Sequence, residues 1–404
     1  MKFLLLFLSV LIFHCVCVFP SFSGITSGDK LKTGDSLYTI AFLLPFNGNK
    51  VYIRDLEKSD FYFPGESQIA VEFYQGAMLA LDSLIKMGMN ATILVYDVGR
   101  DSATVNEVLA RPQLKSASLI VGPVNGYALK AVTEFSETEH IPMLSPLSAS
   151  NLPDIPNQFY ILANATLRTH CERIYDYLLQ NRLSHRTILW YRNKPEDLEM
   201  VNYFNDYRMK KTEMGNPSLR IIEYNDSSRK NHLRVRDSLF LTDKNILLVP
   251  SNNESFVKSV LKQVADLRED YDIEVVGMPT WINFDLVPAE SFDSANTVIT
   301  SSYYLDKNSF QAVKFKTAYF NAYKMNPSDY SVRGYDELFY FGSHLLQMGS
   351  RLFLSVFPNA TGLTTATSYK VVPVMKQERE VIYRENKSVF FLHRENGGWT
   401  KMNY

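Results

Sequence analysis

Cysteine is almost missing from this sequence of 404 residues, which contains only three. Cys15 and Cys17 lie in the apolar N-terminal segment, so Cys171 alone remains for the rest of the chain. One cysteine cannot form an internal disulfide, which excludes the disulfide-stapled fold of small secreted domains. A chain of this length can instead be stabilised by apolar cores, and it is long enough for two lobes.

An excess of charge is also missing. Lys and Arg number 42 against 43 Asp and Glu, which gives a formal net charge of −1. No basic patch dominates the sequence, so we expect no nucleic acid as a partner. Beyond the N-terminal segment no apolar run approaches the length of about 20 residues that a membrane-spanning helix needs. We therefore expect no integral membrane segment in the mature chain.

Catalytic and metal-binding motifs are absent as well. The seven histidines are scattered, without a His-x-x-x-His pair and with none near Cys171, so no metal site is expected. The sequence has no Gly-x-Ser-x-Gly elbow and no Walker-type loop. Cys171 lies inside an expected helix, where burial makes a thiol inert. We therefore expect no cofactor and no enzymatic activity.

The N-terminus has the three parts of a secretory signal peptide. Met1-Lys2 provides a positive start, residues 3–13 are apolar except for Ser9, and Ser21-Phe22-Ser23 is a small-x-small exit. The alternative is a retained N-terminal anchor, but the apolar run is shorter than a membrane-spanning helix. We predict a signal peptide over 1–23 and a periplasmic or otherwise extracytoplasmic protein.

Cys15 and Cys17 raise the question of a lipid anchor. Lipidation needs small residues just before the cysteine, whereas Phe13-His14 precedes Cys15 and Val16 precedes Cys17. Both sites are poor matches, so cleavage near Ser23 is favoured over lipoprotein anchoring. The mature chain would then begin with the small, polar segment 24–36, which is typical of a flexible leader.

Strands and helices alternate along the rest of the sequence, in two successive series. The expected strands are 37–45, 92–96, 118–121, 142–144, 159–162, 186–191, 219–224, 245–250, 273–277 and 297–304. The expected helices are 70–86, 102–109, 127–137, 167–181, 196–211, 255–268, 310–323 and 335–349. Such alternation predicts an α/β protein with parallel sheets covered by helices on both faces. Two series favour two doubly wound lobes over the alternative of one large sheet.

The two ends of this pattern are less regular. Residues 47–65 are expected to form a long polar loop. The tail from Ser368 to Asn403 is rich in β-branched and aromatic residues and contains Gly397-Gly398. It is interpreted as a strand pair that ends the chain, with its turn at the two glycines.

Two neighbouring segments, Gly122–Ala131 and His140–Asn151, combine Gly-Pro, a helix, Ile-Pro, a short strand and a Ser-Pro loop. This pattern resembles the type I periplasmic binding protein family, and most closely its leucine/isoleucine/valine-binding branch. Further segments that agree in order are Ile40–Pro45 with Tyr74–Leu81, Ile246–Gly277, and Arg333–Asp336. The resemblance covers most of the mature chain.

The resemblance implies two lobes joined by three crossings of the chain, with a small polar ligand held between them. We expect the crossings near Ala163, Thr300 and Ser355. Lobe one then comprises 36–163 plus 300–355, and lobe two comprises 164–299 plus 356–404. A membrane permease or another envelope protein is the partner that the family implies.

Ligands of open α/β sheets bind beyond the carboxyl ends of the strands. The candidate ligand-binding residues at these ends are Asn47, Asn125, Gly126, Ser145, Ser148, Ser150, Asn193, Asn252, Trp281, Tyr335 and Asp336. The amides of residues 124–126 at a helix start favour a carboxylate, and the serines add hydroxyl donors. Asp336 is a candidate partner for an ammonium group, and Trp281 a candidate apolar face.

Each of these residues also has a purely structural interpretation. Asn125 and Gly126 are ordinary turn residues, and serines often cap loops locally. Asp336 is placed to cap a helix that starts at Tyr335, and a tryptophan such as Trp281 is often part of a core. Both interpretations stay open at this point.

The sequence departs from the family pattern at its amino-acid anchor. Gly126 stands where the family has a binding serine, and the Ala/Thr positions of the Ser-Pro loop fall on residues 147–149. Two functions therefore remain. The first is an extracytoplasmic solute-binding protein for an amino acid, peptide or organic acid, serving an ABC transporter. The alternative is an envelope interaction protein on the same fold, such as a regulator of cell-wall synthesis with a vestigial cleft.

Overall fold

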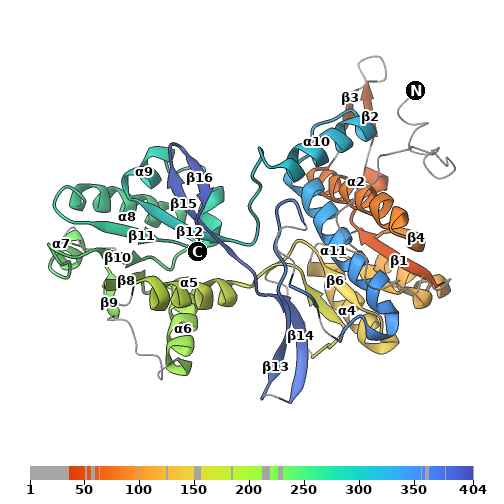
Figure 1. Ribbon diagram of the computed structural model, residues 1–404, viewed down its shortest axis with the longest axis horizontal. Coiled ribbons are helices and arrows are strands. Elements are labelled where there is room, and N and C mark those ends of the chain that lie inside the picture. Colours follow the sequence, from red (N-terminus) through yellow and green to blue (C-terminus); the bar gives the residue numbers. More distant parts are fainter. Residues whose placement is uncertain are drawn as a thin grey trace, which may run out of the picture. The chain divides into compact units, whose positions relative to one another are not determined.

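The computed structural model describes most of the chain from Ser36 onward (Figure 1). The described residues are 36–50, 52–55, 60–62, 64–99, 101–123, 126–149, 156–182, 185–211, 219–225, 231–355, 357–359, 364–377 and 379–403. The predicted signal peptide, the predicted leader up to residue 35, and Cys15 and Cys17 lie outside them.

Two seven-stranded, mostly parallel sheets organise the described residues, which confirms the predicted α/β fold with two doubly wound lobes. The first sheet, which defines lobe one, has the order β13-β14-β7-β6-β5-β1-β4. Its strands are β1 (Leu37–Leu44), β4 (Asn90–Asp97), β5 (Leu119–Val121), β6 (Met143–Ser145), β7 (Tyr160–Leu162), β13 (Val371–Lys376) and β14 (Glu380–Asn386).

The second sheet defines lobe two and has the order β16-β15-β12-β11-β10-β8-β9. Its strands are β8 (Arg186–Arg192), β9 (Leu219–Tyr224), β10 (Asn245–Leu248), β11 (Ile273–Val276), β12 (Thr297–Ser301), β15 (Phe390–Glu395) and β16 (Gly398–Lys401). A small separate hairpin, β2 (Tyr52–Asp55) with β3 (Asp60–Tyr62), falls in the segment expected to be only a loop.

Helices follow most of the parallel strands, as the alternating pattern predicts. Those of lobe one are α2 (Gly65–Lys86), α3 (Ser102–Leu109), α4 (Gly126–Glu139), α10 (Phe310–Tyr323) and α11 (Asp329–Leu352). Those of lobe two are α5 (Leu167–Arg182), α6 (Pro195–Lys210), α7 (Asn231–Arg236), α8 (Glu254–Leu267) and α9 (Ala289–Ser294). Short 3-10 helices η1 (Gly48–Lys50), η2 (Pro112–Ser116) and η4 (Pro279–Asn283) complete the connections.

The burial of strand β1 on both faces explains why its sequence is almost continuously apolar. Successive side chains of a strand point to opposite faces, and both faces of this sheet are covered. Phe42 packs into one apolar cluster with residues of α2 and α11, whereas Leu43 packs into a second cluster with residues of α3 and α4. A strand buried on both faces needs apolar residues at every position.

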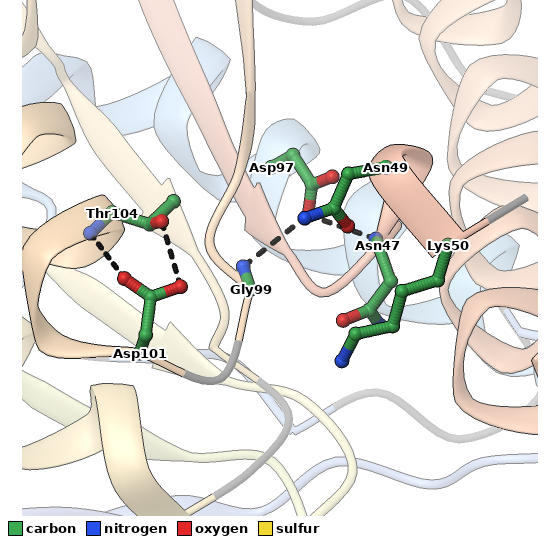
Figure 2. Close-up of a pocket in the computed structure, with 7 residues that line it drawn as sticks. All are labelled: Asn47, Asn49, Lys50, Asp97, Gly99, Asp101 and Thr104. Atoms are coloured by element: carbon green, nitrogen blue, oxygen red, sulfur yellow. Dashed lines mark hydrogen bonds between the residues drawn. The ribbon is translucent and has the colours of Figure 1, made fainter.

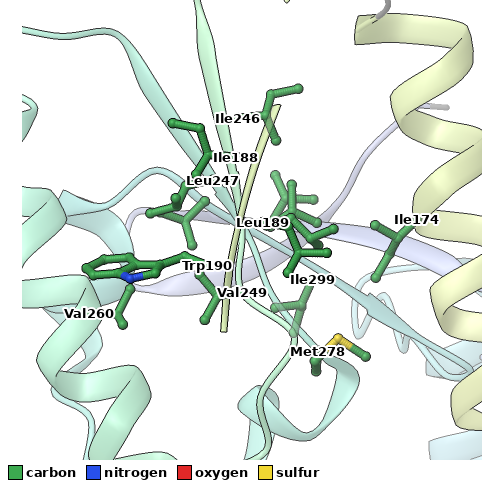
Figure 3. Packing of buried hydrophobic residues seen from close by; sticks show 14 of the residues in the cluster. Ile174, Ile188, Leu189, Trp190, Ile246, Leu247, Val249, Val260, Met278 and Ile299 are labelled. Carbon is green, nitrogen blue, oxygen red and sulfur yellow. The ribbon is translucent and has the colours of Figure 1, made fainter. Parts of the chain in front are cut away.

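Lobe two has one continuous core around its central strands (Figure 3). Trp190 of β8 is fully buried beside Val260 of α8, while Ile174 of α5 approaches from another side of the sheet. The β10 pair Ile246 and Leu247 is also fully buried. Helices on both faces therefore exclude water from this sheet, and its polar groups collect at the strand ends.

The tail of the chain differs from the expected single strand pair. It forms two hairpins in different sheets: β14 pairs with β7 in lobe one, and β15 pairs with β12 in lobe two. Residues 371–386 thus belong to lobe one, and the third crossing lies at 387–389 rather than near Ser355. The assignment of the whole segment 356–404 to lobe two was wrong, because both hairpins have the same strand-like composition and only their distant partners separate them.

Two local boundaries also need correction. The β15–β16 turn is Asn396-Gly397, one residue earlier than expected, and both residues have positive φ (52° and 76°), as a two-residue hairpin turn requires. Helix α11 begins at Asp329 rather than 335, because the Ser328 side chain accepts a hydrogen bond from the Ser331 amide and caps it there.

Helices α2 and α11 cross at unusually short range in lobe one. A Cβ atom on Gly76 would lie 1.7 Å from the backbone oxygen of Ser331, and one on Gly334 would lie 2.0 Å from the backbone oxygen of Phe73. Two glycines therefore face the opposite backbone on either side of the crossing. Any side chain here would force the helices apart.

We predict that Gly76→Ala lowers the free energy of unfolding by about 1–3 kcal/mol, in spite of the better helix propensity of alanine. Urea denaturation followed by circular dichroism measures the change. Gly65→Ala is the matched control, because no atom lies within 4 Å of its Cβ position. Equal stability of the two variants would contradict the close crossing.

The three crossings between the lobes are joined by buried hydrogen bonds. The Asn386 side chain donates to the carbonyl oxygens of Ala163 and Ser368, both at 3.0 Å. His170 lies 2.8 Å from the Thr300 hydroxyl and 3.3 Å from the Ser302 hydroxyl through its two ring nitrogens. Asn386, next to the third crossing, thus bonds to the first crossing, and His170, in the helix after the first crossing, contacts the second.

Burial lowers the pKa of His170 from its ordinary 6.5 to about 3, so the ring is neutral in the folded chain at neutral pH. Between these values the unfolded chain binds a proton that the folded chain does not. The resulting stability is present above pH 6.5 and is lost as the pH falls toward 3.

We predict that His170→Asn flattens this acid dependence by up to about 1.4 kcal/mol per pH unit between pH 6 and 4. Urea midpoints across this range measure the slope, which does not depend on any loss of packing. His140→Asn, at an exposed histidine with positive φ, is the control. An unchanged slope in the His170 variant would contradict a neutral, buried ring.

Candidate functional site

Asp97, the last residue of β4, organises the loop that follows β1. Its carboxylate accepts hydrogen bonds from the amides of Asn47 (3.0 Å), Gly48 (2.8 Å) and Gly99 (3.3 Å). The Asn47 side chain is buried and donates to the Pro45 carbonyl oxygen at 2.9 Å. The predicted ligand residue Asn47 is thus part of the loop scaffold as well as of the strand end.

A pocket of about 400 Å³ opens beside this loop (Figure 2). It is lined by Asn47, Asn49, Lys50, Asp97, Gly99, Asp101 and Thr104. Asp101 caps α3 by accepting from the Thr104 amide and hydroxyl, both at 2.8 Å. The side chains of Lys50 and Asn49 are exposed, so this pocket offers a cation and an amide at the edge of lobe one.

The Ser-Pro loop after β6 contains three of the predicted hydroxyl donors. Ser145 is fully buried at the end of β6, whereas Ser148 is half-buried in the loop. The loop is held by Asn164, whose side chain donates to the Pro146 carbonyl oxygen at 2.7 Å. Ser150 lies outside the described residues, so Ser148 is the described serine with access to the strand end.

Arg333 of α11 also reaches this loop. Its guanidinium donates to the side-chain oxygen of Asn164, which places a half-buried cation next to the loop after β6. Sequence reasoning did not select Arg333, although it lies in the Arg333–Asp336 segment that carried part of the resemblance. The positive charge of Arg333 within that segment was the available signal.

Asp336 holds a distant loop and does not face a ligand. Its carboxylate is fully buried and accepts from the amides of residues 365–367, at 2.7, 2.8 and 2.9 Å. Burial raises its pKa to about 6 against the lowering effect of these donors. The expectation that Asp336 pairs with an ammonium group, or caps the start of its helix, is corrected by these contacts.

Tyr335 packs along the same helix. Its half-buried ring stacks on Phe339 with 5.7 Å between centroids and also contacts Phe315 of α10 at 5.2 Å. Its place two turns into α11, rather than at the helix start, follows from the earlier beginning of that helix. Tyr335 was predicted to contact a ligand, and in the structure its ring packs against these two aromatic rings.

In lobe two a buried ion pair supports the loops after β8 and β10. The Arg192 guanidinium donates to both carboxylate oxygens of Asp197, each at 2.9 Å. The Ser251 hydroxyl donates to the same carboxylate at 2.9 Å, and the amide of Asn253 donates to that hydroxyl at 3.2 Å. Asp197 has no exposed surface, so its charge is neutralised within this network.

The exposed polar residues of lobe two sit on this support. Asn193 follows β8 and is exposed, and Asn252 follows β10 and accepts a hydrogen bond from the Thr280 hydroxyl at 2.7 Å. Trp281 is fully buried and donates from its indole nitrogen to the Ser251 carbonyl oxygen at 2.7 Å. Its ring belongs to the core and not to a ligand face, which corrects that expectation.

The remaining predicted residues concern the Gly-Pro loop. Gly126 is the first residue of α4, as expected for a helix start after β5, while Asn125 lies outside the described residues. Each lobe therefore presents polar groups near its strand ends: Ser148, with Arg333 of α11 beside its loop, in lobe one, and Asn193, Asn252 and Thr280 in lobe two.

Two further features of the described residues concern metal binding and membrane insertion. No group of three or more His, Cys, Asp and Glu side chains is arranged there to hold a metal ion. Among the helices of the same residues, none is both long and apolar enough to cross a membrane.

Comparison by sequence finds no matching protein-family model and no matching curated protein. Comparison of structures does find relatives in shape. A putative branched-chain amino acid ABC transporter protein of Rhodospirillum rubrum has a TM-score of 0.61 and 14% identity, over 91% of this chain and 100% of its own.

Two further solved structures agree. An ABC-type branched-chain amino acid transporter protein of Rhodopseudomonas palustris has a TM-score of 0.58 and 11% identity, over 90% of this chain and 94% of its own. An ABC transporter substrate-binding protein of Desulfitobacterium hafniense, in complex with Leu, has a TM-score of 0.54 and 13% identity, over 91% and 100%. At these identities the likeness establishes the two-lobed type I periplasmic binding protein fold.

We predict that Asp197→Ala lowers the free energy of unfolding by about 3–5 kcal/mol, because it removes the buried counter-charge of Arg192 and leaves only the exposed Glu196 carboxylate, at 3.6 Å. The double variant Arg192→Met/Asp197→Leu should recover most of that loss, since both charges are then removed. Urea denaturation of the three proteins closes the comparison. A double variant as unstable as Asp197→Ala would contradict the paired-charge interpretation.

Proposed function

We propose that this chain is an extracytoplasmic solute-binding protein that holds a small polar ligand between the strand-end groups of its two lobes. The observation that carries the proposal is the placement of exposed or half-buried polar groups at the carboxyl ends of both sheets, on buried hydrogen-bonded supports. Ligands of open α/β sheets bind at such ends. The fold shared with substrate-binding proteins of ABC transporters supports the same role.

The chemistry of these groups favours a ligand with a carboxylate. Arg333 offers a cation, and Ser148 offers a hydroxyl in the neighbouring loop. In lobe two the Asn252–Thr280 pair offers amide and hydroxyl groups of either hydrogen-bonding polarity. Amino acids, short peptides and organic acids all carry the required carboxylate. Because Gly126 replaces the serine of the amino-acid anchor, an organic acid or peptide fits as well as an α-amino acid.

The descriptions of the structures with the same fold support a role in transport. The solved structures named above are described as ABC transporter components, and none of their descriptions indicates an enzyme. We therefore propose delivery of the bound solute to a membrane permease from an extracytoplasmic compartment. Hinge motion about the three crossings would open and close the binding site.

We predict that one of three ligand classes (amino acids, short peptides or organic acids) raises the melting temperature in a thermal-shift screen. At 100 times the dissociation constant the stabilisation amounts to about 2.7 kcal/mol. Removal of one hydrogen bond to a charged group costs about 1.5–3 kcal/mol, so Arg333→Gln should weaken binding about 10- to 100-fold. Calorimetric titration measures this change.

A second pair of variants tests the contribution of lobe two. Asn252→Ala should weaken binding of the same ligand, whereas Asn202→Ala, at an exposed position on the outer helix α6, should not. If no ligand of any class shifts the melting temperature, the solute-binding role is refuted, and an envelope interaction protein on the same fold becomes the better explanation.

A further inference from the structure

Helix α10 has a face that packs within lobe one. Phe315 and Tyr319 are buried there, and the Tyr319 and Tyr323 hydroxyls donate to the side-chain and backbone oxygens of Gln75 in α2, at 2.5 and 3.1 Å. The helix is thereby fixed against α2, beside which it is seen in Figure 1. This packing buries one side of α10 and leaves the opposite side exposed.

The outward side is apolar. Phe310, Val313 and Phe320 are 67%, 52% and 49% exposed, and Met325, just past the helix end, is 48% exposed. At 100° per residue the three helical positions lie within about 80° of one another, on one stripe opposite the packed face. Single exposed apolar side chains are ordinary, but an aligned set is typical of an interaction surface. We call Phe310, Val313, Phe320 and Met325 the α10 stripe.

Lysines border the α10 stripe. Lys314 and Lys316 lie on its two flanks at this helical spacing, and Lys307 and Lys324 lie near its two ends; all four are exposed. Residues 307–328 contain no Asp or Glu. The exposed carboxylates Asp306 and Asp329 lie only beyond the two ends of this segment. An apolar ridge flanked by lysines fits a partner that accepts aromatic side chains and carries negative charge.

A second copy of this chain does not meet that requirement. Two α10 stripes placed face to face would bring lysine against lysine, which is repulsive. Four side chains also form a much smaller patch than the roughly 800 Å² per partner of a stable protein interface. A shallow, extended and negatively charged surface fits this ridge better than a compact protein groove.

We propose that the α10 stripe docks on an anionic phospholipid surface. Phenylalanines that enter the headgroup region while flanking lysines contact lipid phosphates are the arrangement by which amphipathic helices lie in a membrane interface. Each lysine near such a surface contributes about 1 kcal/mol, or about fivefold in affinity. With few apolar side chains the attachment is weak and reversible, and it uses no residue of the proposed ligand site.

The test is co-sedimentation of the full chain with vesicles of phosphatidylglycerol and phosphatidylcholine (1:1) or of phosphatidylcholine alone. Binding is expected only to the phosphatidylglycerol vesicles and should fall with added salt. Phe310→Ser/Phe320→Ser should reduce partitioning at least tenfold, and Lys314→Glu/Lys316→Glu at least about 25-fold, since it removes two cations and adds two anions. All variants keep the same N-terminus, so a contribution from residues 1–35 cancels.

Matched controls lie in lobe two. Leu241→Ser/Leu286→Ser changes two leucines that are 73% and 62% exposed, and Lys258→Glu/Lys262→Glu reverses two exposed lysines on α8. Both should leave vesicle binding unchanged. Binding that persists in the α10 variants, equal loss in the controls, or no binding to any vesicle would overturn the proposal and leave an acidic protein partner for the stripe. None of these outcomes depends on a solute, so they are separate from the ligand screen.

Discussion

Buried or half-buried carboxylates hold the connections of this molecule in place. Asp97 fixes the loop after β1, Asp197 holds the loops after β8 and β10, Asp336 holds residues 365–367, and Glu385 accepts from the Thr166 amide at 2.8 Å. An ionised group away from water is costly unless hydrogen bonds and counter-charges satisfy it. Each carboxylate therefore dictates one arrangement of the backbone around it, and the strand-end polar groups inherit that rigidity.

The regular elements were predictable because their signals are local. Helix α3 and strand β9 have the predicted bounds, and the two-faced burial of β1 follows from its unbroken apolar run. The placement of the last four strands was not predictable in the same way. Strands β14 and β15 have similar compositions, and their assignment to different sheets depends on contacts with β7 and β12, far away in the sequence.

The candidate site divides along the same line. The rule that ligands bind at carboxyl ends of strands placed Asn47, Asn193 and Asn252 at those ends. It could not separate an exposed residue from a buried one. Trp281 packs in the apolar core and bonds to Ser251, and Asp336 is buried against amides about 30 residues away. Arg333 was not predicted as a site residue, because it approaches the loop after β6 through a contact with Asn164, which is distant in the sequence.

The threefold passage of the chain between the lobes also has a consequence for synthesis. Each sheet receives its final strands from the last part of the chain, and Asn386 bonds to Ala163 across 223 positions. A growing polypeptide can complete neither sheet until its C-terminal hairpins have been made, and such distant pairings form slowly. The nascent chain therefore stays incompletely folded for almost the whole of its translation.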